Sequence, residues 1–69
     1  MKISAMNQLK GKVVSIQEGA VNGLVTLDIG GGNTITATIS MNSIKELGLS
    51  AGKEASAIIK ATSVMIAVE

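Results

Sequence analysis

The fold is decided by Val21-Asn22-Gly23-Leu24-Val25-Thr26-Leu27-Asp28-Ile29, a stretch in which two kinds of residue alternate. Small or apolar residues occupy every odd position, and mostly polar residues occupy the positions between them. Successive side chains of a β-strand point to opposite faces, so a period of two is typical of a strand with one buried face. The stretch therefore predicts a half-buried strand over residues 21–29.

The same alternation continues on both sides of this stretch. Upstream, Val14 and Ile16 alternate with polar neighbours within residues 10–17, and Glu18-Gly19-Ala20 predicts the connection of a hairpin. Downstream, Gly30-Gly31-Gly32-Asn33 interrupts the pattern before a Thr-rich and Ile-rich run over residues 34–40. The glycine run lacks the Gly-Lys-Ser/Thr ending of a phosphate-binding loop, and a strand pattern follows it, so we interpret it as a second hairpin turn.

The period changes after the third strand. Met41, Ile44 and Leu47 share one face of a helix, Ser40 is a suitable N-cap, and Gly48 suits the position just past the C-terminal end. Alternation returns after a turn at residues 50–53: Ala55, Ala57 and Ile59 indicate a fourth strand, and Val64, Ile66 and Val68 indicate a fifth, after a break at residues 61–63.

Five short strands with one short helix between strands 3 and 4 is the element order of the OB-fold. We therefore predict an all-β protein, a five-stranded OB-fold-like barrel that forms a single domain over residues 1–69. A β-sandwich is the alternative, but it usually contains more strands. Glycine and alanine, at Gly11, Gly23, Ala55 and Ala57, suit the close backbone approach of a small barrel.

Composition narrows the classes of function. The chain has 69 residues, no cysteine, histidine or aromatic residue, and 46% hydrophobic residues, which is more apolar surface than so small a monomer easily buries. We therefore expect a homo-oligomer. The net charge of +1 provides no field to attract nucleic acid or an anionic membrane. The sequence has neither a signal-like start nor an apolar run long enough to span a bilayer, so a cytoplasmic location is expected.

No group of residues predicts catalysis. Histidine and cysteine, the usual bases and nucleophiles, are missing, and the carboxylates Glu18, Asp28, Glu46, Glu54 and Glu69 show no metal-ligand spacing. We expect neither an enzyme nor an organic cofactor. Hydroxyl groups instead concentrate at the ends of predicted elements, at Ser4, Ser40, Ser43, Thr62 and Ser63, with Lys60 among them. Hydroxyls, backbone N–H groups and a cation are what a tetrahedral oxyanion requires.

Each of these donors also has an ordinary role. Ser40 serves a helix as its N-cap, Ser43 is a solvated residue of the first turn, and Lys60 is a solvated lysine at a strand end. Ser4 is a polar residue in a terminal segment. From the residues alone, both interpretations stay open.

The opening Ser4-Ala5-Met6-Asn7-Gln8-Leu9-Lys10-Gly11 resembles the Ser-Ala-Arg-Asn-Gln-Leu-x-Gly signature of the molbindins, a family of oxyanion-binding proteins. The resemblance extends through Glu18–Asn22, Gly30–Asn33, Glu46–Leu49 and Ala51–Lys53 to Ala57–Val64. It implies a one-domain OB-like barrel that assembles as a hexamer, a trimer of dimers. It also implies binding of molybdate or tungstate between subunits, for storage or homeostasis in the cytoplasm.

The resemblance also implies the site residues. One subunit would contribute Ser4, Ala5, Met6, Lys60, Ala61 and Thr62 to an oxyanion site, and a neighbour would contribute Ser40 and Ser43. A second oxyanion site on the threefold axis would use Gly19, Ala20, Val21 and Asn22. The family's arginine is replaced here by Met6, which preserves the backbone N–H but removes a guanidinium.

Two other functions remain as alternatives. The first is an OB-fold nucleic-acid-binding module, which the architecture permits but which usually requires a basic groove and aromatic stacking residues. The second is an oligomeric scaffold whose anion site is weakened or absent.

Overall fold

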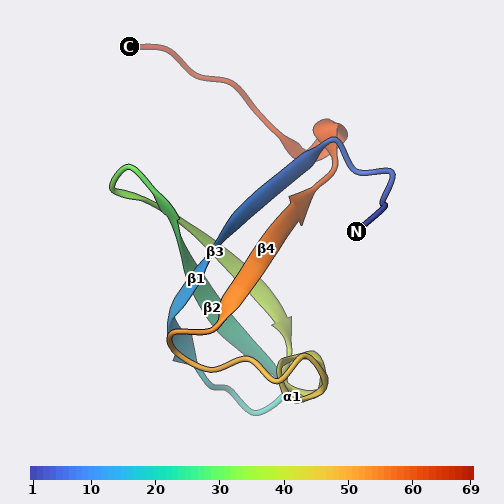
Figure 1. The fold of residues 1–69 in the computed structure, drawn as a ribbon, viewed down its shortest axis with the longest axis vertical. Coiled ribbons are helices and arrows are strands. Elements are labelled where there is room, and N and C mark those ends of the chain that lie inside the picture. Colours follow the sequence, from blue (N-terminus) through green and yellow to red (C-terminus); the bar gives the residue numbers. More distant parts are fainter.

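The computed structural model describes the whole chain, Met1 to Glu69, as four antiparallel strands that curl into a half-barrel (Figure 1). The strands lie in the order β3-β2-β1-β4, so β3 and β4 are the outer strands of the sheet. The elements are β1 (Asn7–Gln17), β2 (Asn22–Gly30), β3 (Asn33–Ser40), α1 (Met41–Glu46), β4 (Glu54–Ile59) and the 3-10 helix η1 (Ala61–Ser63). The predicted all-β class is confirmed.

The stretch that predicts a half-buried strand is the central strand β2. It pairs with β1 on one side and with β3 on the other. Val25 and Leu27 are buried and form the core with Val13 of β1 and Ile44 of α1. Val21, predicted to share this buried face, is 73% exposed, because it lies in the connection before the strand begins. That part of the prediction is wrong.

A β-bulge in β1 reverses part of the predicted alternation. The register with β2 shifts between Val13 and Ser15, and this shift leaves Val14 out of the regular pairing. Val13 is therefore 1% exposed while Val14 is 49% exposed, and Ile16 returns to the inner face. The predicted alternation, which puts Val14 on the same face as Ile16, is wrong at Val14, because a bulge moves one residue out of the two-residue period.

Helix α1 follows β3 and covers one end of the half-barrel. The Ser43 N–H donates to Ser40 Oγ at 3.0 Å, which confirms Ser40 as the N-cap, and Gly48 has a φ of +64° just past the C-terminal end. Gly23 lets the helix approach the sheet, because a Cβ there would lie 2.5 Å from Ile44 Cδ1. No helix of the structure has the length and hydropathy needed to cross a bilayer.

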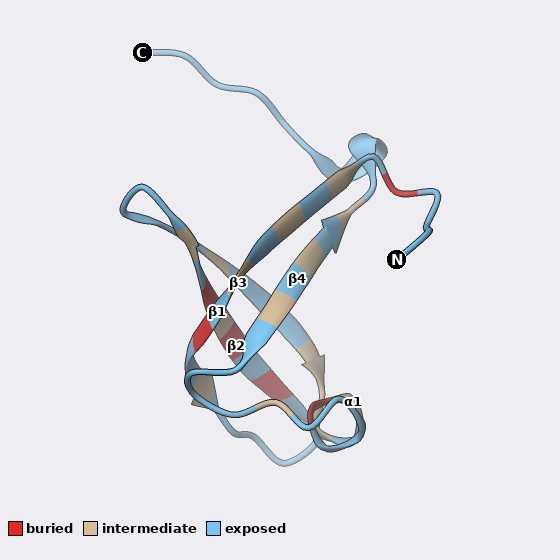
Figure 2. Cartoon of the chain, in the orientation of Figure 1, coloured by how far each residue is buried: buried red, intermediate tan, exposed pale blue.

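The predicted fifth strand is not formed. After η1, Val64 to Glu69 run away from the sheet, and every one of their side chains is exposed (Figures 1 and 2). The barrel is therefore open between its outer strands. The prediction failed for a physical reason: alternation shows that a segment is suited to a sheet, but a strand forms only where another strand offers its backbone groups.

Candidate functional site

Two segments that the sequence analysis assigned to one oxyanion site lie at the same end of the half-barrel. Asn7 pairs with Ile59 at the first position of the β1–β4 ladder, and Asn7 Nδ2 donates to the Ile59 carbonyl at 3.2 Å. Met6 directly precedes Asn7 in the chain, and Lys60 directly follows Ile59. The antiparallel pairing thus brings Ser4–Met6, which precedes β1, beside Lys60–Thr62, which follows β4.

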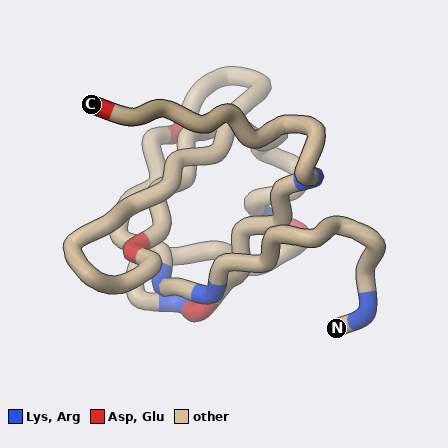
Figure 3. Tube along the Cα trace, turned by 90° about the horizontal axis from the view of Figure 1, so that it is seen from above, with Lys and Arg blue, Asp and Glu red and all other residues tan.

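The surroundings of this end suit an anion. Ala5 is buried and Gln8 Nε2 donates to its carbonyl at 3.2 Å, whereas the Met6 side chain is 83% exposed. Lys60 is an exposed cation, and neither segment contains a carboxylate that would repel a dianion. The site has no strongly charged surroundings, because lysines and carboxylates are scattered along the chain with no long run of one sign (Figure 3).

Lys60–Ser63 form a turn that is held by its own backbone. The Ser63 N–H donates to the Lys60 carbonyl at 2.8 Å, and the Val64 N–H donates to the Ala61 carbonyl at 3.3 Å. Lys60 occupies the N-cap position but makes no side-chain capping bond, and η1 contains no buried residue. Two local backbone hydrogen bonds therefore define the shape of this turn.

The predicted donors Ser40 and Ser43 lie at the opposite end. Ser40 pairs with Asn22, close to the last residue of β1, whereas Ser4–Met6 precede its first residue. The 11 residues of β1 separate the two ends by about 30 Å. Ser40 Oγ lies 2.9 Å from Ser43 Oγ, so the two hydroxyls form one polar pair. A single chain does not bring this pair to Lys60.

The predicted second site lies beside this serine pair. The Met41 N–H donates to the Val21 carbonyl at 2.8 Å, which joins the Gly19–Asn22 turn to the start of α1. Gly19 permits the turn, because a Cβ there would collide with the Asn22 carbonyl oxygen. This proximity is not evident from the sequence, because only the pairing of β2 with β3 places Asn22 opposite Ser40.

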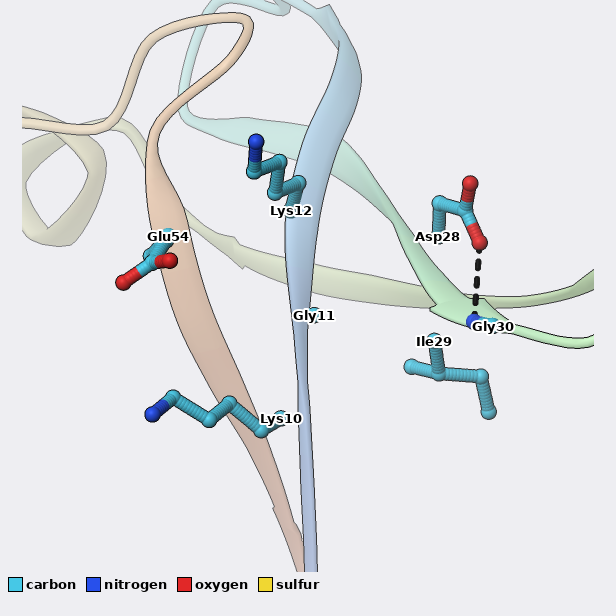
Figure 4. Close-up of a pocket in the computed structure, with 7 residues that line it drawn as sticks. All are labelled: Lys10, Gly11, Lys12, Asp28, Ile29, Gly30 and Glu54. Carbon is cyan, nitrogen blue, oxygen red and sulfur yellow. Dashed lines mark hydrogen bonds between the residues drawn. The ribbon is translucent and has the colours of Figure 1, made fainter.

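An open cleft of about 390 Å³ on the sheet has a different character. Lys10 and Lys12 of β1 lie between Asp28 of β2 and Glu54 of β4 (Figure 4). Asp28 Oδ1 accepts the Gly30 N–H at 2.9 Å and so serves the turn that follows. Two carboxylates beside two lysines leave little net charge, so this cleft is a poor site for a dianion.

Sequence reasoning also missed an apolar groove of about 290 Å³ on the inside of the half-barrel. The outer strands β3 and β4 both line it, and its floor comes from β2 and from Leu47 and Leu49. Its β3 and β4 residues include Ile35, Ala37, Ile39, Ala55, Ala57 and Ile59. The groove lies between the outer strands β3 and β4, which no fifth strand joins.

The curled four-stranded sheet with one short helix, carrying polar segments at both ends, defines an OB-like domain. A model of the TOBE domain matches residues 3–66. A probable molybdenum-pterin-binding protein of Haemophilus influenzae is 67% identical over 69 residues, which are 100% of both chains. The chain belongs to the TOBE-domain family, in its molbindin group.

Solved structures agree with this assignment. MopII from Clostridium pasteurianum superposes with a TM-score of 0.91 and 52% sequence identity, over 97% of this chain and 100% of that one. A molybdate-bound form of ModG, a cytoplasmic molybdate-binding protein, superposes with a TM-score of 0.86 and 48% identity, over 88% of this chain and 43% of ModG. The overall fold, not only a motif, is therefore shared with these proteins.

Proposed function

We propose that this protein binds molybdate reversibly, at sites completed by neighbouring copies of the chain. The observation that carries the proposal is the meeting of Ser4–Met6 with Lys60–Thr62 at the paired ends of β1 and β4. Hydroxyls, backbone N–H groups and one cation without a carboxylate suit a tetrahedral dianion. ModG, which is similar in fold, is described as binding molybdate.

A second copy is needed for two reasons. The Ser40–Ser43 pair lies at the end of β1 remote from Lys60, so it reaches the same anion only from another subunit. The chain also carries an uncovered apolar groove and an uncovered apolar C-terminal segment, each of which needs a partner. We propose that the segment Val64–Glu69 of one copy covers the groove of the other in a dimer.

The remaining parts of the proposal follow from the family. Three such dimers would form a hexamer, with further anions at the Gly19–Asn22 turns around the threefold axis. Tungstate, which is also a tetrahedral dianion, would occupy the same sites. The protein would act by capture and release and not by catalysis, as a cytoplasmic store for the anion.

Met6 sets the expected strength of this site. A charged hydrogen bond contributes about 1.5 to 3 kcal/mol, which is about one to two orders of magnitude in affinity. With methionine at this position, Lys60 is the only side-chain cation of the two segments. The protein would therefore bind molybdate more weakly than a molbindin with arginine at position 6 and release it more readily.

Isothermal titration of the anion-free protein with molybdate, tungstate, sulfate and phosphate tests the proposal. We expect uptake of the first two, at least about tenfold weaker binding in Lys60→Ala, and tighter binding by one to two orders of magnitude in Met6→Arg. Lys10→Ala is the matched control, because Lys10 lies in the mixed-charge cleft and its removal changes the net charge by the same amount.

Three results would contradict the proposal in different ways. Equal weakening in Lys10→Ala and Lys60→Ala would show that only net charge matters. A hexamer in native mass spectrometry that takes up no oxyanion would favour the scaffold alternative. Tight binding of single-stranded nucleic acid would favour the OB-fold module.

A further inference from the structure

We infer that Asn7 and Gln8 are positioning residues of the anion site. The side-chain amide of each holds the carbonyl end of one peptide group and so fixes the direction of the N–H at the other end. The two N–H groups are those of Met6 and Lys60, and both are left free for the anion. This inference rests on the proposed function and adds two residues to the site.

The Gln8 amide holds the peptide group between Ala5 and Met6. Gln8 Nε2 donates to the Ala5 carbonyl at 3.2 Å. All peptide bonds of the chain are trans, and in a trans peptide the C=O and the N–H point in opposite directions. The bond therefore directs the Met6 N–H away from the Gln8 side chain. Ala5 is buried between exposed neighbours, which restricts the same peptide group further.

The Asn7 amide holds the peptide group between Ile59 and Lys60. Asn7 Nδ2 donates to the Ile59 carbonyl at 3.2 Å, across 52 positions of the chain. The Ile59 carbonyl thus faces β1, so the Lys60 N–H points toward the outer edge of β4, where no strand pairs. Two amides that are adjacent in the sequence therefore control one donor in each of the two segments.

Both N–H groups are available to a ligand. Neither the Met6 N–H nor the Lys60 N–H donates to a backbone carbonyl or to a side-chain acceptor of the chain. Water commonly satisfies such groups at the ends of strands. Here the carbonyl of each peptide group is held, so an anion oxygen would replace that water with little further loss of conformational freedom.

This arrangement explains how methionine can serve at position 6. The donor there is the backbone N–H, and its direction is set by Gln8 and not by the side chain of residue 6. The side chain at position 6 and the Gln8 amide would therefore make separate contributions, the first to charge and the second to direction. Added salt should reduce the gain from Met6→Arg but not the loss from a substitution of Gln8.

Two substitutions that keep the size of the side chain and remove its donor test the inference in the intact chain. They are Gln8→Met and Asn7→Leu. Gln17→Met is the matched control, because Gln17 lies at the other end of β1 and its side chain is exposed. The measurements are titration with molybdate and proton–nitrogen correlation NMR spectra with and without molybdate, with circular dichroism to verify that each variant is folded.

In the parent protein, molybdate should shift the amide proton resonances of Met6 and Lys60 downfield, because both N–H groups would donate to a charged oxygen. We expect Gln8→Met and Asn7→Leu each to weaken binding by about threefold to tenfold. Gln8→Met should reduce the shift of Met6 most, whereas Asn7→Leu should reduce the shift of Lys60 most. Gln17→Met should bind within about twofold of the parent protein.

A general loss of structure would lower affinity without this pairing of each variant with one resonance. Parent-like affinity in both variants, or equal reductions of the two shifts in each, would overturn the inference while leaving the proposed function intact. If Asn7→Leu does not fold, Gln8→Met decides alone, because its hydrogen bond lies within the terminal segment and not between strands. A parent protein that takes up no molybdate would overturn both.

Discussion

Strand β2 and the C-terminal segment Val64–Glu69 both carry alternating apolar side chains, but they lie in opposite environments. Val25 and Leu27 are 3% and 6% exposed, because β1 and β3 pair on either side and α1 covers one end. Ile66 and Val68 are exposed, because no strand pairs with them. The difference shows that a two-residue period makes a segment suitable for a β-strand. Whether the strand forms depends on a neighbouring strand with free backbone N–H and C=O groups.

The largest difference between β2 and the C-terminal segment is expected in the free energy of unfolding when one side chain in each is truncated. Leu27→Ala should lower the free energy of unfolding by about 2 to 5 kcal/mol, because it leaves a cavity in the small core. Ile66→Ala should change it by no more than about 0.5 kcal/mol at protein concentrations where the chain is monomeric. Urea unfolding followed by circular dichroism measures both values.

Concentration provides the control for this comparison. At concentrations where copies associate, Ile66→Ala should lower the melting temperature relative to the parent protein, because association stabilises the folded chain by mass action. A loss of several kcal/mol for Ile66→Ala in the dilute monomer would mean that the segment packs on its own chain.

A second, smaller effect tests how closely the paired strands approach. A Cβ at Gly11 would collide with the backbone carbonyl oxygen of Asp28, which the β1–β2 ladder holds in place. Gly11→Ala should therefore destabilise the protein by about 1 to 3 kcal/mol. Gly23→Ala is the matched comparison, because its Cβ would meet the Ile44 and Met41 side chains at 2.5 and 2.9 Å and backbone, the Gln17 carbonyl oxygen, only at 3.4 Å, so mainly side chains would have to shift.

Thermal unfolding of the two glycine variants measures this difference. The C-terminal segment contains no glycine and no such close approach, which agrees with its lack of a partner strand. If Gly23→Ala were the more destabilising of the two, side-chain crowding under α1 and not the approach of the strands would limit the fold.

Much of the fold was predictable because its signals are local. The Ser40 cap, the Gly48 position and the hairpin turn before Asn33 depend on residues within a few positions of one another. The bulge at Val14 and the absence of a fifth strand depend on partners distant in sequence, which local patterns do not report. A period of two assumes regular pairing, so it fails where pairing shifts or stops.

The residues of the candidate site are a prediction from the sequence, whereas their arrangement comes from the fold. Hydroxyl groups at element ends and the lone Lys60 could be identified from the sequence, and resemblance grouped them. That Ser40 lies at the far end of β1 from Lys60 follows only from the strand register. The apolar groove was missed because it is formed by outer strands that are not neighbours in the sheet.

The smallest expected change in stability concerns the two short helices. They differ in whether a side chain caps the N-terminal end, just as β2 and the C-terminal segment differ in whether a partner is present. Helix α1 has a capping hydroxyl from Ser40, whereas Lys60 gives η1 no side-chain cap. Ser40→Ala should cost about 1 kcal/mol of stability, because the Ser43 N–H loses its acceptor. Ser43→Ala should cost less, since it keeps that backbone bond and removes only the contact between the two hydroxyls.

Chemical denaturation without molybdate isolates this structural role. Titration with molybdate then separates it from binding: if the serine pair completes a neighbour's site, both variants should lose affinity although only one loses the cap. A loss of affinity that followed stability in the two variants would restrict Ser40 and Ser43 to the role of holding the helix.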